Sequence, residues 1–124
     1  MENSKRVLVV EDEQGLRMVV ESEIVRAGYD VVSVSNGLDA IATLSKEQFD
    51  LAILDVTLPG KSGLEVLHYI RERRFRTRVI MLAGMEGISV AIKAVKLGAD
   101  DYIPKPFDAG YLLASVRTVL RQRQ

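Results

Sequence analysis

The sequence contains no cysteine among its 124 residues. This absence excludes disulfide bonds and thiolate metal ligands, and it fits a reducing cytoplasm. Stability must therefore come from an apolar core. Apolar residues make up 48% of the chain and charged residues 27%, which is typical of a globular protein and not of a disordered one. A domain of this length buries roughly 65–70% of its unfolded surface.

Net charge and long apolar runs are also absent. The 17 basic and 17 acidic residues cancel, so any electrostatic function must be local, and overall charge attracts neither nucleic acid nor anionic membrane. The apolar run at residues 7–10 is too short for a secretory signal or a membrane span. We therefore expect a cytoplasmic protein that binds neither nucleic acid nor membranes directly.

Five short apolar runs recur along the chain. Continuous runs rich in β-branched residues are typical of strands that are covered on both faces, as in a parallel sheet. The second and fifth runs are weaker, as edge strands would be. The runs lie at residues 7–10, 31–34, 51–54, 79–82 and 102–103.

Amphipathic stretches separate these runs, and their apolar spacing predicts a helix after each strand. Gly28 and Gly98 follow the first and fourth stretches as helix-ending residues, and Asp108 precedes the fifth as a predicted N-cap. The apolar stripes are Leu16, Val19, Val20, Ile24 and Ala27; Ala40, Ile41 and Leu44; Leu64, Leu67 and Ile70; Ile88, Ala91, Ile92 and Val95; and Leu112, Val116, Val119 and Leu120.

Five alternations of strand and helix with short connections predict an α/β fold. Parallel strands joined by right-handed helical crossovers form a doubly wound (βα)5 three-layer sandwich. No repeat, low-complexity tract or linker interrupts the pattern, so we expect one domain over residues 1–124. The order of the strands cannot be read from the periodicity.

Charged residues follow three of the apolar runs. Glu11, Asp12 and Glu13 follow the first run, Asp55 follows the third, and Lys105 follows the fifth. Ligands of open α/β sheets bind beyond the carboxyl ends of the strands, so we expect these side chains to converge on one rim.

Crowded carboxylates repel each other and raise each other's pKa unless a cation lies among them. An all-oxygen ligand set favours a hard divalent ion, and Mg²⁺ is the usual one when phosphate is the other partner. Glu11, Asp12 and Glu13 could instead simply begin the first helix, where acids complement the helix dipole. Their combination with Asp55 and Lys105 favours the metal site.

Three segments resemble the signature blocks of response-regulator receiver domains, the chemotaxis-regulator-like modules of two-component signalling. They are Val-Val-Glu-Asp-Glu (9–13), Leu-Asp-Val-Thr-Leu-Pro-Gly (54–60) and Lys-Leu-Gly-Ala-Asp-Asp-Tyr-Ile-Pro-Lys-Pro-Phe (96–107). Each block is weak alone, but together, in order and at the family's spacing, they are specific. The resemblance covers essentially the whole chain and implies a flavodoxin-like fold with the strand order 2-1-3-4-5.

The resemblance implies a role for each acid on the rim. Asp55 matches the aspartate that accepts a phosphoryl group, and Glu11 and Asp12 match the pair that binds Mg²⁺ together with it. Thr57 matches the residue whose backbone carbonyl completes the metal site. A carboxylate is chemically able to attack phosphorus and form an acyl phosphate.

Three further positions are implied by the same resemblance. Lys105 matches the lysine that pairs with the acceptor and then with the phosphoryl group, and the bond between Lys105 and Pro106 is expected to be cis, which proline makes less costly. Tyr102 matches the aromatic residue that reports the switch.

One residue departs from the family's pattern. At the end of the fourth strand the family carries Ser or Thr, whose hydroxyl binds the phosphoryl group, and here the position is Ala83. A hydrogen bond to a charged group contributes about 1.5–3 kcal/mol, so its loss weakens the bias toward the active state by roughly 10- to 150-fold. We expect phosphorylation to persist and the conformational response to be blunted.

Other charged residues have simpler interpretations. His68, the only histidine, is expected on the surface of the third helix. The arginines at 71, 73, 74, 76 and 78 are expected to form a solvated helix end and loop on the rim away from Asp55. Members joined to winged-helix DNA-binding domains often carry Glu at the position of Tyr111 and Arg at that of Ser115, and both are missing here. We therefore discount that particular dimer.

The leading prediction is a phosphorylation-controlled signalling domain and not an enzyme. Its expected partners are a histidine kinase or phosphotransfer protein and an output partner, fused or separate, that binds the fourth helix, fifth strand and fifth helix. A receiver fold that signals without phosphate is the first alternative, favoured by Ala83. A phosphatase with an aspartate nucleophile is remote, because Thr57 stands where such enzymes need a second aspartate. A flavodoxin-type cofactor site is disfavoured by the lack of a glycine-rich phosphate loop after the first run.

Overall fold

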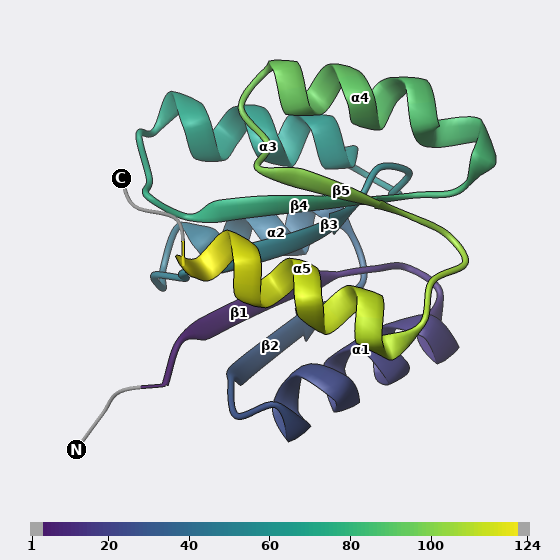
Figure 1. Cartoon of the computed structure of the whole chain (residues 1–124). Helices are drawn as coiled ribbons and strands as arrows, with labels where there is room; N and C mark the ends of the chain where they lie inside the picture. The colour runs from purple at the N-terminus through teal and green to yellow at the C-terminus, as the bar shows by residue number, and fades with distance from the viewer. Residues whose placement is uncertain (1–3, 122–124) are drawn as a thin grey trace.

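The computed structural model describes residues 4–121, which form one five-stranded parallel sheet with helices on both faces (Figure 1). The strand order is β2-β1-β3-β4-β5, so the predicted fold class and strand order are confirmed. β2 and β5, the weaker apolar runs, are the edge strands. The elements are β1 (Arg6–Val10), α1 (Gln14–Arg26), β2 (Asp30–Val34), α2 (Gly37–Leu44), β3 (Leu51–Asp55), α3 (Gly63–Glu72), β4 (Arg78–Ala83), η1 (Met85–Gly87), α4 (Ile88–Lys96), β5 (Asp101–Pro104) and α5 (Ala109–Arg121).

The sheet separates two apolar cores. Successive strand residues point to opposite faces, so Val7 and Val9 pack with α1 and α5, whereas Leu8 and Val10 pack with α2, α3 and α4. Figure 1 shows α1 and α5 on one side of the sheet and the other three helices on the opposite side. The three central strands are buried on both faces, which explains their continuous apolar runs.

The apolar spacing predicted only part of the buried face of each helix. Val20 and Ile24 of α1 are fully buried, but Val19 is 56% exposed. In α4 the buried residues are Ala91 and Ala94, whereas Ile92 and Val95, which the spacing placed in the core, are 44% and 38% exposed. A helix that covers an edge of the sheet buries a narrow stripe, so the apolar residues beside that stripe remain on the surface. Among residues 4–121, no helix has the length and apolar character needed to cross a membrane.

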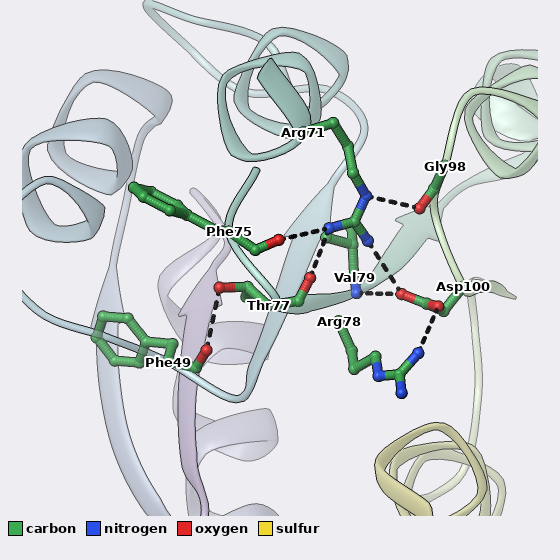
Figure 2. Close-up of polar contacts among 8 residues, drawn as sticks. All are labelled: Phe49, Arg71, Phe75, Thr77, Arg78, Val79, Gly98 and Asp100. Atoms are coloured by element: carbon green, nitrogen blue, oxygen red, sulfur yellow. Dashed lines mark hydrogen bonds and ion pairs between the residues drawn. The ribbon is translucent and has the colours of Figure 1, made fainter. Parts of the chain in front are cut away.

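The arginines near the end of α3 do not all lie in solvent as predicted. Arg71 donates hydrogen bonds to the carbonyl oxygens of Thr77 (2.7 Å) and Gly98 (3.0 Å) and pairs with Asp100 at 3.2 Å (Figure 2). Arg78 also pairs with Asp100, at 3.6 Å. One planar guanidinium therefore joins the α3–β4 loop to the α4–β5 turn. This contact lies at the amino ends of β4 and β5, whereas Asp55 lies at the carboxyl end of β3.

Arg71→Met should lower the free energy of unfolding by about 2 kcal/mol, because the backbone carbonyls of Phe75, Thr77 and Gly98 and the Asp100 carboxylate lose a charged donor. Arg71→Lys should recover only part of this loss, since an ammonium lacks the planar fork. Chemical denaturation of both variants checks the prediction, with Arg76→Met as the matched control because Arg76 is exposed. Equal stability of the Arg71 and Arg76 variants would contradict it.

Candidate functional site

Three charged side chains lie just beyond the apolar core, on the face of the sheet that the alternation of side chains along each strand predicts. Each charged residue comes two positions after a core residue of its strand: Glu11 after Val9, Asp55 after Ile53 and Lys105 after Ile103. Val9, Ile53 and Ile103 all belong to the core beneath α1 and α5, and side chains two residues apart point to the same face.

Backbone hydrogen bonds extend the sheet to these positions. The N–H of Glu11 donates to Val34 O at 3.2 Å, and the N–H of Lys105 donates to Ala83 O at 2.8 Å. The peptide bond that follows, between Lys105 and Pro106, is cis. Regular strand geometry therefore brings the three charged groups to one edge.

The carboxylates of Glu11, Asp12 and Asp55 form a compact cluster. Each of the three offers an oxygen within 4.8 Å of the others. The Lys105 ammonium lies 3.0 Å from Glu11 Oε1 and hydrogen-bonds Asp55 Oδ2. The predicted acids and the predicted lysine are thus brought together on one rim of the sheet.

Burial differs sharply within the cluster. Glu11 is 1% exposed and Asp55 is 4% exposed, whereas Asp12 lies on the surface. Asp12 lines a hollow of about 510 Å³ with Ser35, Asn36, Leu38, Asp39, Pro59 and Gly60. The site therefore has a buried floor and an open side at Asp12.

The electrostatics follow from this burial. Desolvation of Glu11, with the nearby Asp55 carboxylate, raises the pKa of Glu11 to about 7. Burial works to lower the pKa of Lys105, but its contacts with Asp55 and Glu11 outweigh burial and raise that pKa. The ammonium therefore stays charged near neutral pH and offsets only part of the acidic charge.

The donor set fits a hard divalent cation. Glu11 Oε1 is buried, and the Lys105 ammonium lies 3.0 Å from it without a well-aligned hydrogen bond. A single ammonium leaves part of the charge of the buried carboxylates uncompensated, which is costly, and a cation bound by oxygen ligands would neutralise that charge.

The turn between β3 and α3 holds Asp55 in place. The N–H of Thr57 donates to Asp55 Oδ1 at 2.9 Å. Ser62 and Glu65 form a reciprocal capping box at the start of α3, which orients the helix directly after the turn. Thr57 therefore has a demonstrated contact with Asp55 through its amide, besides the role that the resemblance implies for its carbonyl.

Gly63 is a residue of this site that the sequence interpretation missed. A Cβ at Gly63 would lie 2.1 Å from the carbonyl oxygen of Asp55, a distance that only the absence of a side chain permits. The first turn of α3 therefore presses against the backbone of Asp55. The available signal was weak: glycine lacks a Cβ and so permits a close approach of two backbones, but the sequence does not show which backbone would approach.

Ala83 and Tyr102 lie on the other face of the sheet. Tyr102 pairs in register with Met81, two residues before Ala83, and both Tyr102 and Ala83 pack with the core beneath α4. Ala83 is 1% exposed, and a Cβ at Gly87 would lie 3.6 Å from its methyl group. The methyl group is therefore covered by the turn that precedes α4.

Two residues that the sequence singled out lie outside the cluster. His68 is exposed on α3, with Glu72 at 3.7 Å, as expected of a surface histidine. Ser115 is buried and donates a hydrogen bond to Asp101 at 2.7 Å. This bond connects α5 to β5 within the chain.

The comparisons with known proteins agree with this geometry. The family described as the response regulator receiver domain matches residues 7–117. The chain is 40% identical over 118 residues to the transcriptional regulatory protein PcoR of Escherichia coli, covering 95% of this chain and 52% of that protein. It is 34% identical over 121 residues to the alkaline phosphatase synthesis transcriptional regulatory protein PhoP of Bacillus subtilis (strain 168), covering 98% and 50%. The chain thus spans about half the length of these relatives.

Solved structures show the same fold. A CheY-like response regulator receiver domain protein from Methanospirillum hungatei JF-1 superposes with a TM-score of 0.89 at 28% identity, covering 95% of this chain and 94% of that one. The receiver domain of NtrX from Brucella abortus gives a TM-score of 0.89 at 29% identity, covering 94% and 99%. The chain belongs to the response-regulator receiver domain family of two-component signalling proteins.

Proposed function

We propose that this chain is a phosphoacceptor signalling domain that receives a phosphoryl group on Asp55. The observation that carries the proposal is the convergence of Glu11, Asp12 and Asp55 with the Lys105 ammonium at the carboxyl edge of the sheet. The whole of residues 1–124 would act as one receiver domain, since the described elements share a single sheet.

The proposed reaction is a transfer from a phosphohistidine of a partner. A carboxylate oxygen of Asp55 forms a bond to phosphorus as the bond from phosphorus to the donor nitrogen breaks, and the electron pair of that bond leaves with the imidazole, which takes up a proton. Lys105, already in contact with Asp55 and Glu11, neutralises charge on the incoming phosphoryl oxygens and positions the group. The product is an acyl phosphate.

The residues that would hold Mg²⁺ are Glu11, Asp12 and Asp55, with the backbone carbonyl of Thr57. When bound, Mg²⁺ supplies charge neutralisation to the transferring group. The carboxylates are already gathered within 4.8 Å of one another, so little rearrangement is needed. Incubation with acetyl phosphate tests the function: intact mass should rise by one phosphoryl group with Mg²⁺, and no gain in its presence would contradict the proposal.

An atypical receiver with a weakened switch is the second candidate, and Ala83 favours it. A buried methyl group offers no hydrogen bond to a phosphoryl group on Asp55, so phosphorylation would move the loop before α4 less strongly. Tyr102 packs on the same core as Ala83, so its surroundings should report this difference.

Ala83→Thr should strengthen the response to phosphorylation. The added hydroxyl would bias the phosphorylated protein toward its active state by roughly 10- to 150-fold. The NMR chemical shifts of the Tyr102 ring, recorded with acetyl phosphate and Mg²⁺, should change more than in the wild type. Ala83→Val is the matched control, since valine has the shape of threonine without the hydroxyl. Similar shifts in the Thr and Val variants would show that the hydroxyl has no such role.

Receiver domains of response regulators interact with histidine kinases and with output domains. We propose the same two kinds of partner here, with the output partner, fused or separate, binding α4, β5 and α5. This face exposes Ile92, Val95 and Tyr111. Ser115, at the position where some family members carry an arginine that pairs across a dimer, instead hydrogen-bonds Asp101 of the same chain. PcoR and PhoP are named transcriptional regulators and are about twice as long as this chain.

A further inference from the structure

The segment between β1 and α1 carries two of the three clustered acids outside regular secondary structure. Within the segment, the N–H of Glu13 donates to Glu11 Oε2 at 3.1 Å. The Glu13 side chain accepts from the N–H of Leu16 at 2.7 Å and so caps α1. Both of these bonds use a carboxylate oxygen, whereas the bond from the N–H of Glu11 to Val34 O holds the segment through its backbone.

Arg17 provides a further contact of this kind. Its Nη1 donates to the carbonyl oxygen of Glu11 at 2.9 Å and lies 3.5 Å from that of Asp12. Its own N–H donates to Glu13 O at 2.9 Å, and the residue is half-buried. Both acceptors of the guanidinium are backbone carbonyls, so the positive charge lies beside the acidic segment without occupying a carboxylate oxygen.

We propose that Arg17 is a positioning residue for cation binding, acting through the backbone of Glu11 and Asp12. The proposal rests on the function proposed above and deepens it. The three carboxylates repel one another, and Glu11 and Asp12 lie on the segment between β1 and α1, whereas Asp55 ends β3. Arg17 restrains this segment in two ways: it holds the carbonyl of Glu11 and lies near that of Asp12, and its charge offsets part of the repulsion.

The proposal separates Arg17 from a residue that merely stabilises the fold. A purely structural arginine would affect unfolding in Mg²⁺-free buffer and leave the dissociation constant of the folded protein for Mg²⁺ unchanged. Groups that orient metal ligands typically affect metal affinity by 10–100-fold when removed. Metal affinity is therefore the quantity to measure.

The test is calorimetric titration of the full chain with Mg²⁺, for the wild type and for Arg17→Met. The dissociation constant of the Met variant should rise about tenfold or more. Arg17→Lys keeps the charge but has a single donor group, so its constant should rise less. Arg26→Met is the matched control from the same helix, since Arg26 is exposed and pairs with Glu23 at 3.4 Å; its constant should equal that of the wild type.

Phosphorylation by acetyl phosphate gives a second measurement. The Mg²⁺ concentration for half-maximal rate should rise in Arg17→Met, while the rate at saturating Mg²⁺ should approach that of the wild type. If this variant does not fold, Arg17→Lys carries the same comparison.

The two proposals fail in different ways. A wild type that binds no Mg²⁺ overturns the proposed metal-dependent function and this inference with it. A wild type that binds Mg²⁺ with the same affinity as its folded Arg17 variants overturns the role of Arg17 alone, even if those variants are less stable.

Discussion

Asp55→Asn should abolish the Mg²⁺-dependent gain of a phosphoryl group from acetyl phosphate. The amide keeps the size of the side chain but offers no anionic oxygen to attack phosphorus. It also removes one of the three clustered negative charges, which weakens Mg²⁺ binding. Intact-mass measurement over the time in which the wild type is fully modified checks the result.

The control for this variant is Asp30→Asn, an exposed aspartate at the start of the edge strand β2. It removes the same charge from the protein and should be phosphorylated at the wild-type rate. Phosphorylation of Asp55→Asn to the wild-type level would place the acceptor elsewhere. Loss of phosphorylation in both variants would point to an effect of overall charge and not to the site.

Gly63→Ala should lower the free energy of unfolding by about 3 kcal/mol, at the upper end of the cost of overpacking. The new methyl carbon would lie 2.1 Å from the carbonyl oxygen of Asp55 and 3.0 Å from the Cα of Val56. Both neighbours are backbone atoms of β3 and the turn after it, so neither is able to rotate away. For a domain of this length the midpoint of thermal unfolding should fall by on the order of 10 °C.

The same substitution should also slow phosphorylation of the molecules that remain folded, because relief of the clash displaces Asp55 from Lys105. Gly84→Ala is the matched control. Gly84 has an ordinary φ of −71°, and a Cβ there meets nothing within 4 Å. If Gly63→Ala were as stable as Gly84→Ala, the close approach of α3 to Asp55 would have no energetic consequence.

The strands were the most predictable part of the fold. The run at 51–54 became β3, Leu51–Asp55, and the weak run at 102–103 became β5, Asp101–Pro104. Apolar runs mark the central strands because strands between two helical layers bury their side chains on both faces. The edge strands β2 and β5 are only partly buried, which explains their weaker runs. The exposed faces of helices were harder: Ile92 has the spacing of a core residue, yet it lies at the surface because α4 covers an edge of the sheet.

The candidate site was predictable only in part. Glu11, Asp12, Asp55 and Lys105 follow strands, and the rule that ligands bind at the carboxyl edge of such sheets brought them together. Arg17 and Gly63 at the site, and Arg71 away from it, gave no comparable signal. Their roles depend on backbone carbonyls that lie close to them only in the folded chain. Every residue has such a carbonyl, so the sequence does not indicate which ones will be close.

The sequence by itself determined the alternation of strands and helices and the positions of the acids and the lysine at strand ends, because periodicity records burial along each element. Tertiary structure alone decided which backbone atoms lie against Gly63, what Arg17 and Arg71 bind, and which apolar helix residues stay exposed. These features arise from contacts between separate segments, and local spacing contains no information about such contacts.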